Sequence, residues 1–186
     1  MSAGPRPEVR RRARGCRIVR GARASVLAAT AAAIALALFA VGARTEELSA
    51  PDRPPTVTGR GDLDFEDVVA GVPAAITRKD RHRAGAWWIR GTANVDVLLS
   101  LALPPSLSGP AGAQLPIAFG SDDAGFSWQQ RPDLATGFNP HVPRVERLGS
   151  NGHGWVFLGG TVQPGLGQRA GAYLGTVVLT VAYVAQ

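Results

Sequence analysis

Short apolar and β-branched segments recur along the chain beyond residue 61, separated by turns rich in glycine, proline and aspartate. Within these segments apolar and polar residues alternate, which is typical of strands that bury one face. No stretch of this region has the apolar spacing of an amphipathic helix. The pattern predicts an all-β fold with strands at 62–72, 73–78, 86–91, 94–104, 115–121, 125–130, 154–162 and 170–186.

The closing segment, 170–186, has the clearest alternation. One side carries its large apolar residues, Tyr173, Val177, Leu179, Val181 and Tyr183. The segment 94–104 repeats the arrangement, with one side formed by Val95, Val97, Leu99, Leu101 and Leu103. Strands with one continuous apolar face are what two sheets need when they pack face to face. We therefore expect an antiparallel β-sandwich and not a closed barrel.

The first 43 residues differ from the rest in charge and hydropathy. They hold eight arginines and one acidic residue, Glu8, and they end in the uncharged stretch 24–43. This combination ends in small residues of the kind that precede a signal-peptidase cleavage site, and it predicts a secretory signal peptide cleaved after Ala43. An uncleaved membrane anchor is the alternative, because a helix of that length spans about 30 Å. Both place the rest of the chain in the periplasm, on the cell surface or outside the cell. A buried helix of the domain is a third interpretation.

The basic charge of the chain belongs to this N-terminal part. The whole chain has a net charge of +6 and a pI of about 10.9, values that suggest a nucleic-acid partner. Residues 1–43 alone carry +7, so the remaining residues carry −1 in total. We therefore predict no nucleic-acid partner, and contact with a membrane through the N-terminal segment only.

The sequence divides into three parts. Residues 1–43 form the signal peptide or anchor, residues 44–60 form a polar linker with three prolines, and residues 61–186 form the β-sandwich domain. The lone cysteine, Cys16, lies in the first part. The domain therefore has no disulfide and no cysteine ligand for a metal, and its stability must come from its core.

Candidate catalytic and metal-binding groups are scattered. The chain has no nucleophile-elbow, zinc-protease, phosphate-loop or dinucleotide motif. Histidines fall in separate predicted loops, at His82, His141 and His153. The densest acidic cluster is Asp62, Asp64, Glu66 and Asp67, and a calcium site there would need further oxygen ligands. The acidic cluster is better explained as the solvent-exposed side of a first strand, whose Leu63 and Phe65 point into the core. We predict no enzymatic activity, no cofactor and no metal. The acidic residues at 122–125 are interpreted as a hairpin turn.

Two of the four tryptophans, Trp87 and Trp88, are adjacent. In a strand they must point to opposite faces, so one of them lies outside the core. An outward tryptophan is a candidate surface for carbohydrate or a partner protein, unless the loop 131–153 folds over it. The other two tryptophans are predicted to be in the core, because Trp128 and Trp155 alternate with Phe126 and Phe157.

Three stretches resemble a bacterial family catalogued as domain of unknown function 4402. The block "WVFLGGTVQPGLGQRAGAYLGTVVLTVAYV" (155–184) is similar to the end of that family, with Gly-Gly-Thr, a turn containing proline and glutamine, and Gly-x-Tyr-x-Gly-Thr before a final Val-x-Tyr. "GDLDFEDVVAG" (61–71) resembles its opening strand, although Glu66 stands where a glycine is more usual. "AWWIRGTANVDVLLSLALP" (86–104) resembles its middle, and the resemblance is lost in 105–150.

The resemblance implies a fold and a class of function. The family is similar to spore coat protein U and to fimbrial subunits, which are immunoglobulin-like sandwiches, and it implies no catalytic residues. Fimbrial subunits also end in an alternating apolar strand that a chaperone or a neighbouring subunit pairs with. We therefore predict a structural or adhesive surface protein. Its closing strand is a candidate for pairing with a second copy or with an envelope protein, and the candidate pairing surface is Tyr173, Val177, Leu179, Val181 and Tyr183.

Three alternatives remain open, and the last of them is an exported hydrolase, which a buried pair of carboxylates in a cleft would indicate. In the first, 172–184 form an ordinary interior strand of a self-complete sandwich, because the linker 44–60 has no alternating apolar run to donate and its prolines lack ladder N–H groups. In the second, the chain is a monomeric secreted ligand-binding module, whose surface is the loop 131–153 and the outward tryptophan.

Overall fold

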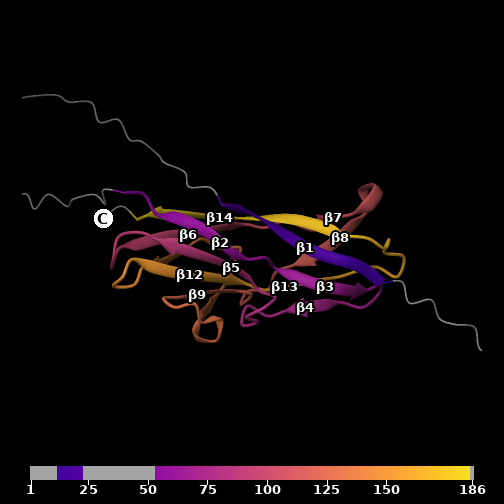
Figure 1. The fold of residues 1–186 in the computed structure, drawn as a ribbon, viewed down its shortest axis with the longest axis horizontal. Coiled ribbons are helices and arrows are strands. Elements are labelled where there is room, and N and C mark those ends of the chain that lie inside the picture. Colours follow the sequence, from indigo (N-terminus) through magenta and orange to yellow (C-terminus); the bar gives the residue numbers. More distant parts are fainter. Residues whose placement is uncertain (1–11, 23–52, 185–186) are drawn as a thin grey trace, which may run out of the picture.

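Two β-sheets face each other across one apolar core. The structure, a computed structural model, describes residues 12–22 and 53–184 (Figure 1). Within these residues nine strands form one sheet and five form the other, and two short 3-10 helices lie in connections, η1 (Pro110–Gly112) and η2 (Pro132–Leu134). The all-β class and the two-sheet architecture predicted from the alternation are confirmed.

The larger sheet runs in the order β11-β6-β14-β7-β8-β13-β4, and β1 joins β14 to β3 beside this path. Its strands are β1 (Arg12–Ala22), β3 (Asp64–Val69), β4 (Ala74–Ile76), β6 (Asp96–Ala102), β7 (Ser106–Ser108), β8 (Gln114–Ala118), β11 (Arg144–Arg147), β13 (Gly160–Val162) and β14 (Tyr173–Tyr183). The smaller sheet runs in the order β10-β9-β12-β5-β2. Its strands are β2 (Thr56–Gly61), β5 (Gly85–Arg90), β9 (Ala124–Ser127), β10 (Thr136–Phe138) and β12 (His153–Leu158).

The core is built from the inward positions of both sheets. Strand β14 contributes Tyr173, Val177, Leu179 and Val181, all at most 2% exposed, whereas its Tyr183 is half-buried at the rim of the core. From β6, Val97 and Leu99 are buried, and Leu101 packs against the core from its edge. Each large apolar side chain buried here stabilises the fold by about 1.5–3 kcal/mol before the loss of chain entropy is subtracted. The apolar faces read from the alternation are confirmed.

A single predicted strand, 154–162, is divided between the two sheets. Residues up to Leu158 form β12 in the smaller sheet, and residues from Gly160 form β13 in the larger one. Between them lies Gly159, where a Cβ atom would collide with the backbone carbonyl oxygen of Ile76. The chain can change sheets here because glycine lets two backbones approach closely.

Five strands were not predicted: β1, which lies in the segment expected to be a leader, and four others. Strand β2 occupies the end of the stretch 44–60 that composition assigned to a linker, and it pairs along β5 from Thr56 onward. The other three are β7, β10 and β11, each of three or four residues, which lie in stretches interpreted as turns. Strands this short show little alternation, and only their neighbours in the sheet define them.

The turn at 122–125 is not a hairpin. It is held by a hydrogen bond from the backbone N–H of Gly120 to Asp123 Oδ2 at 2.6 Å. Strand β8 before it pairs with β7 and β13, and strand β9 after it pairs with β10 and β12. The turn therefore carries the chain from one sheet to the other.

Part of the predicted leader lies outside the described residues. The structure describes residues 12–22 as a strand, whereas the apolar run 24–43 and the cleavage position Ala43 are not among the described residues. Across the ranges 12–22 and 53–184, no helix is both long and apolar enough to cross a membrane.

Candidate functional site

Strand β1 fills a position one strand wide between β14 and β3. It runs parallel to β14, from Cys16 opposite Tyr173 to Ala22 opposite Leu179, and antiparallel to β3, from Arg12 opposite Val69 to Arg17 opposite Asp64. Figure 1 shows β1 (indigo) alongside β14 (yellow). We call this position the β3/β14 slot: the backbone edges of β14 over Tyr173–Leu179 and of β3 over Asp64–Val69.

The slot determines how β3 is attached to the sheet. Among the described strands, β3 pairs with β1 only, whereas β14 also pairs with β6 and β7 along its other edge. The side chains of Leu63, Phe65 and Val68 are nevertheless buried in the core. Strand β3 is therefore anchored by its side chains, and its ladder hydrogen bonds depend on the strand in the slot.

The residues proposed as a pairing surface on β14 are core anchors. The hydroxyl of Tyr173 donates to the carbonyl of Arg169 at 2.7 Å and accepts from Gln168 Nε2 at 2.6 Å. At the other end the Tyr183 hydroxyl donates to Thr92 Oγ1 at 3.2 Å and accepts from the Thr92 N–H at 2.7 Å. These side chains hold β14 in place, so the part of the strand available for pairing is its backbone edge.

The adjacent tryptophans point to opposite faces of β5, as predicted. Trp87 is 3% exposed in the core, and Trp88 is half-buried on the outer face of the smaller sheet.

The prediction for Trp128 and Trp155 was wrong, because Trp128 is 62% exposed and Trp155 is half-buried beside Trp88. Phe126 belongs to the core, whereas Phe157 is buried on the outer face, stacked against Trp155 at 6.4 Å. Alternation identifies which residues share a face of a strand, but it does not say which face is covered.

The outer face of the smaller sheet carries a row of aromatic rings with cationic side chains on it. Trp88 stacks on Trp155 with ring centroids 6.0 Å apart, and His153 meets Trp88 edge-on at 5.1 Å. The guanidinium carbons of Arg60 and Arg90 lie 4.7 and 5.0 Å from the Trp88 ring centroid. We call this set, Arg60, Trp88, Arg90, His153 and Trp155, the aromatic-cationic face.

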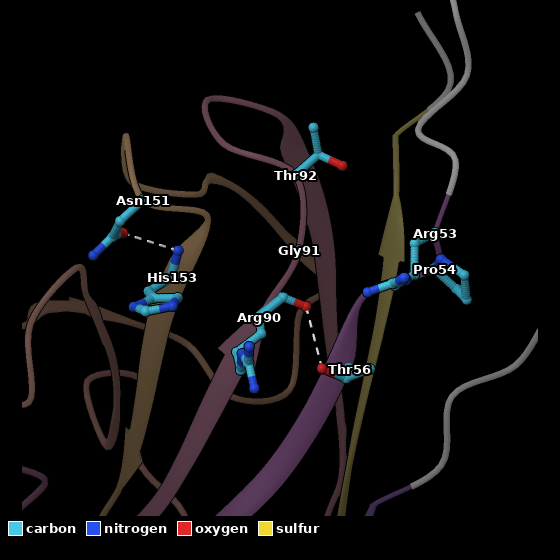
Figure 2. A pocket seen from close by; sticks show the side chains of 8 residues that line it. All are labelled: Arg53, Pro54, Thr56, Arg90, Gly91, Thr92, Asn151 and His153. Carbon is cyan, nitrogen blue, oxygen red and sulfur yellow. Dashed lines mark hydrogen bonds between the residues drawn. The ribbon is translucent and has the colours of Figure 1, made fainter.

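A hollow of about 490 Å³ opens at one end of this face. Figure 2 shows the residues around it, which lie at the start of β2 and just before it, at the end of β5 and just after it, and at the start of β12 and in the turn before it. Its arginine side chains are Arg53 and Arg90, and its other polar side chains are Thr56, Thr92, Asn151 and His153. Asn151 Oδ1 accepts the backbone N–H of His153 at 3.0 Å, which leaves the amide NH₂ of Asn151 as a donor. Among the residues that the structure describes, no acidic side chain lines the hollow.

Most other arginines of residues 53–184 have an acidic partner. Ion pairs with carboxylates are made by Arg78, Arg81, Arg83, Arg131, Arg144 and Arg147. The hydrogen bond from Arg147 holds the pKa of Asp96 below its ordinary value, and that from Arg131 holds the pKa of Asp133 well below its ordinary value. In residues 53–184 no carboxylate lies within ion-pair distance of Arg53, Arg60 or Arg90. Within residues 53–184, therefore, Arg60 and Arg90 on this face and Arg53 at the hollow have no acidic partner.

The remaining candidates from the sequence are not brought together. Leu63 and Phe65 turn inward as predicted, whereas Asp62 and Asp64 are half-buried and Glu66 is exposed. In the ranges that the structure describes, no group of three or more histidine, cysteine and acidic side chains could hold a metal ion. Two of the histidines, His82 and His141, lie in turns, and the imidazole Nε2 of His141 is 2.9 Å from the carbonyl oxygen of Phe119.

Sequence reasoning singled out the outward tryptophan but missed the cations around it. One signal was present, because Arg90 follows Trp88 by two residues and must share its face. Arg60 and Thr56 were missed because β2 was interpreted as a linker, and His153 because β12 was expected to begin one residue later. Neither a protein-family model nor a curated protein sequence matches this chain.

Proposed function

We propose that this chain is an exported, non-enzymatic surface protein of the structural or adhesive type, and that its pilin-like sandwich accepts a strand from a partner. The observation that carries the proposal is the β3/β14 slot, in which one strand supplies the ladder partners of both neighbours. The resemblance of residues 61–71, 86–104 and 155–184 to domain of unknown function 4402, and through it to fimbrial subunits, supports the same class.

The strand in the slot comes from the segment predicted to be a leader. Residues 12–22 lie within the arginine-rich start of the chain, ahead of the apolar run 24–43. If a signal peptidase cuts after Ala43, β1 leaves with the leader and both edges of the slot lose their partner. Two exposed strand edges that are separated by the width of one strand are templates for strand addition. In this proposal residues 12–22 stand in for a strand that a second copy or an envelope protein supplies.

The test compares the chain that begins at Arg44 with and without a peptide copying residues 12–22, in which Cys16→Ser prevents oxidation. Binding to the folded state alone should raise Tm by about 5–10 °C at a peptide concentration of about 100 times Kd. Light scattering over a concentration series should show association of the chain alone, and the peptide should suppress it. These are the results expected if the slot accepts a strand in trans.

A matched control peptide carries Ile18→Pro. Proline has no backbone N–H and cannot complete the ladder, so this peptide should leave both Tm and association unchanged. A chain that stays monomeric at every concentration and ignores both peptides would overturn strand acceptance. In that case the self-complete sandwich would be the better description.

The second candidate, a monomeric ligand-binding module, is favoured by one observation. The aromatic-cationic face ends in a hollow of about 490 Å³ with polar side chains around it. This candidate predicts a monomer whose behaviour the strand peptide does not change, but which binds a small or extended ligand on the smaller sheet.

A further inference from the structure

We infer that the aromatic-cationic face and its hollow bind a carboxylate-bearing sugar chain. The inference does not depend on strand exchange, because the face lies on the smaller sheet and the β3/β14 slot belongs to the larger one. It is carried by the charge of the face, by the way its arginines are held, and by the hydrogen-bonding groups around the hollow.

The charge of the face is local. Residues 44–186 together carry −1, so this part of the chain does not attract polyanions through its net charge. Arg60 and Arg90 lie against Trp88, and Arg53 and Arg90 line the hollow. No carboxylate of residues 53–184 is within ion-pair distance of these three arginines, although six other basic side chains have such a partner. An anion here would meet charges that no carboxylate of residues 53–184 neutralises.

The two arginines against Trp88 are held in position. Arg60 and Arg90 each place the guanidinium carbon within about 5 Å of the ring centroid of Trp88, where the electrons of the ring attract the cation and restrict the side chain. Trp88 is itself fixed by Trp155 and His153 on a rigid sheet. Such an arrangement suits bidentate hydrogen bonding to a planar carboxylate, with little side-chain entropy left to lose on binding.

The neutral side chains favour a ligand rich in hydroxyl groups. Thr56, Thr92 and Asn151 surround the charged groups of the hollow and offer hydroxyl and amide groups. A single-stranded nucleic acid would need ring faces free for base stacking. Here the Trp88 ring is already contacted by two guanidinium groups, Trp155 and His153. Sugar hydroxyls with a carboxylate match the face better than bases with phosphates.

The test is an NMR titration of the full-length chain with oligogalacturonate. The arginine-rich leader also attracts anions, so the readout is local: the indole N–H signal of Trp88 and the Nε–H signals of Arg60 and Arg90. We expect these signals to shift with a saturable curve. The fully methyl-esterified oligomer, which has the same sugars without the charge, should leave them unchanged.

Two variants provide the matched comparison. The double substitution Arg60→Gln with Arg90→Gln should weaken binding, read from the Trp88 signal, by about tenfold or more, since each charge-assisted hydrogen bond lost costs at least that factor. Arg169→Gln removes one charge from an exposed residue that lines no part of the hollow, and it should leave Kd within about twofold. Thermal unfolding of each variant checks that the fold is intact.

Three outcomes would overturn the inference. The first is a Trp88 signal that does not move with oligogalacturonate. The second is an equal loss of affinity in the Arg169→Gln chain, which would mean attraction by net charge only. The third is equal or tighter binding of single-stranded DNA in the same assay, which would assign the face to nucleic acid.

Discussion

Glu66 holds its backbone in the left-handed region, with a φ of 52°. It lies where the register between β1 and β3 shifts, and its N–H donates to Asp64 Oδ1 at 3.0 Å. A residue with a Cβ atom is strained in this conformation by about 1–2 kcal/mol, and glycine is not.

We predict that Glu66→Gly raises the free energy of unfolding by about 0.5–1 kcal/mol. The relief of strain exceeds the extra chain entropy of glycine in the unfolded state, which opposes it by about 0.5–1 kcal/mol. Urea denaturation measures the change. Glu66→Ala is the control, because it removes the carboxylate but keeps the Cβ atom, and it should bring no gain. Equal stabilisation by both variants would attribute the effect to charge.

At this scale the sequence predicted what each side chain faces better than what it touches. The inward positions of β14 and β6 and the opposed Trp87 and Trp88 follow from a period of two, which local geometry dictates. The contacts of Arg60 with Trp88 and of Arg78 with Asp122 join residues far apart in the chain. Such contacts depend on sheet order, which alternation does not contain.

At the scale of elements, β3 depends most on the strand in the slot. Its only ladder partner among the described strands is β1, whereas β5 is paired on both edges by β2 and β12. Amide hydrogens exchange slowly where ladder hydrogen bonds protect them and open only with the whole fold. Removing β1 should therefore affect the two strands very differently.

We predict that in the chain beginning at Arg44 the amides of residues 67–69 in β3 exchange much faster than those of β5, and that the peptide copying 12–22 restores their protection. Hydrogen exchange read by mass spectrometry distinguishes the two strands. Slow exchange in β3 without the peptide would mean that another segment protects this edge, and the slot would not be open.

The elements missed by the sequence share a physical cause. Strand β2 contains Gly59 and Gly61 and follows Pro54 and Pro55, so its composition is that of a linker. It is a strand because β5 offers it an unpaired edge, and pairing in a sheet outweighs weak intrinsic propensity. The long, strongly alternating β6 and β14 need no such context to be recognised, because their apolar faces identify them.

At the scale of the whole molecule, acid should weaken the fold through carboxylates that the native state holds ionised. The hydrogen bond from the His82 N–H to Asp80, with others from Arg83, lowers the pKa of Asp80 below its ordinary value. Hydrogen bonds from arginine side chains lower the pKa of Asp96 and of Asp133 in the same direction. A carboxyl group whose pKa is lower in the folded state stabilises the fold above its unfolded pKa, about 3.9, and this contribution is lost as the pH falls through the folded value.

The free energy of unfolding should therefore be nearly level from pH 7 to about pH 5 and should fall below about pH 4. Asp80→Asn keeps an oxygen for the His82 N–H but cannot ionise, so it should lower stability at pH 7. The difference in the free energy of unfolding between the two chains should shrink below pH 4, because Asp80 of the unsubstituted chain then also loses its negative charge. Urea denaturation across this pH range measures the difference. A deficit of constant size from pH 7 to pH 3 would show that the amide disturbs the turn itself, and that ionisation of Asp80 contributes nothing to the acid sensitivity of the molecule.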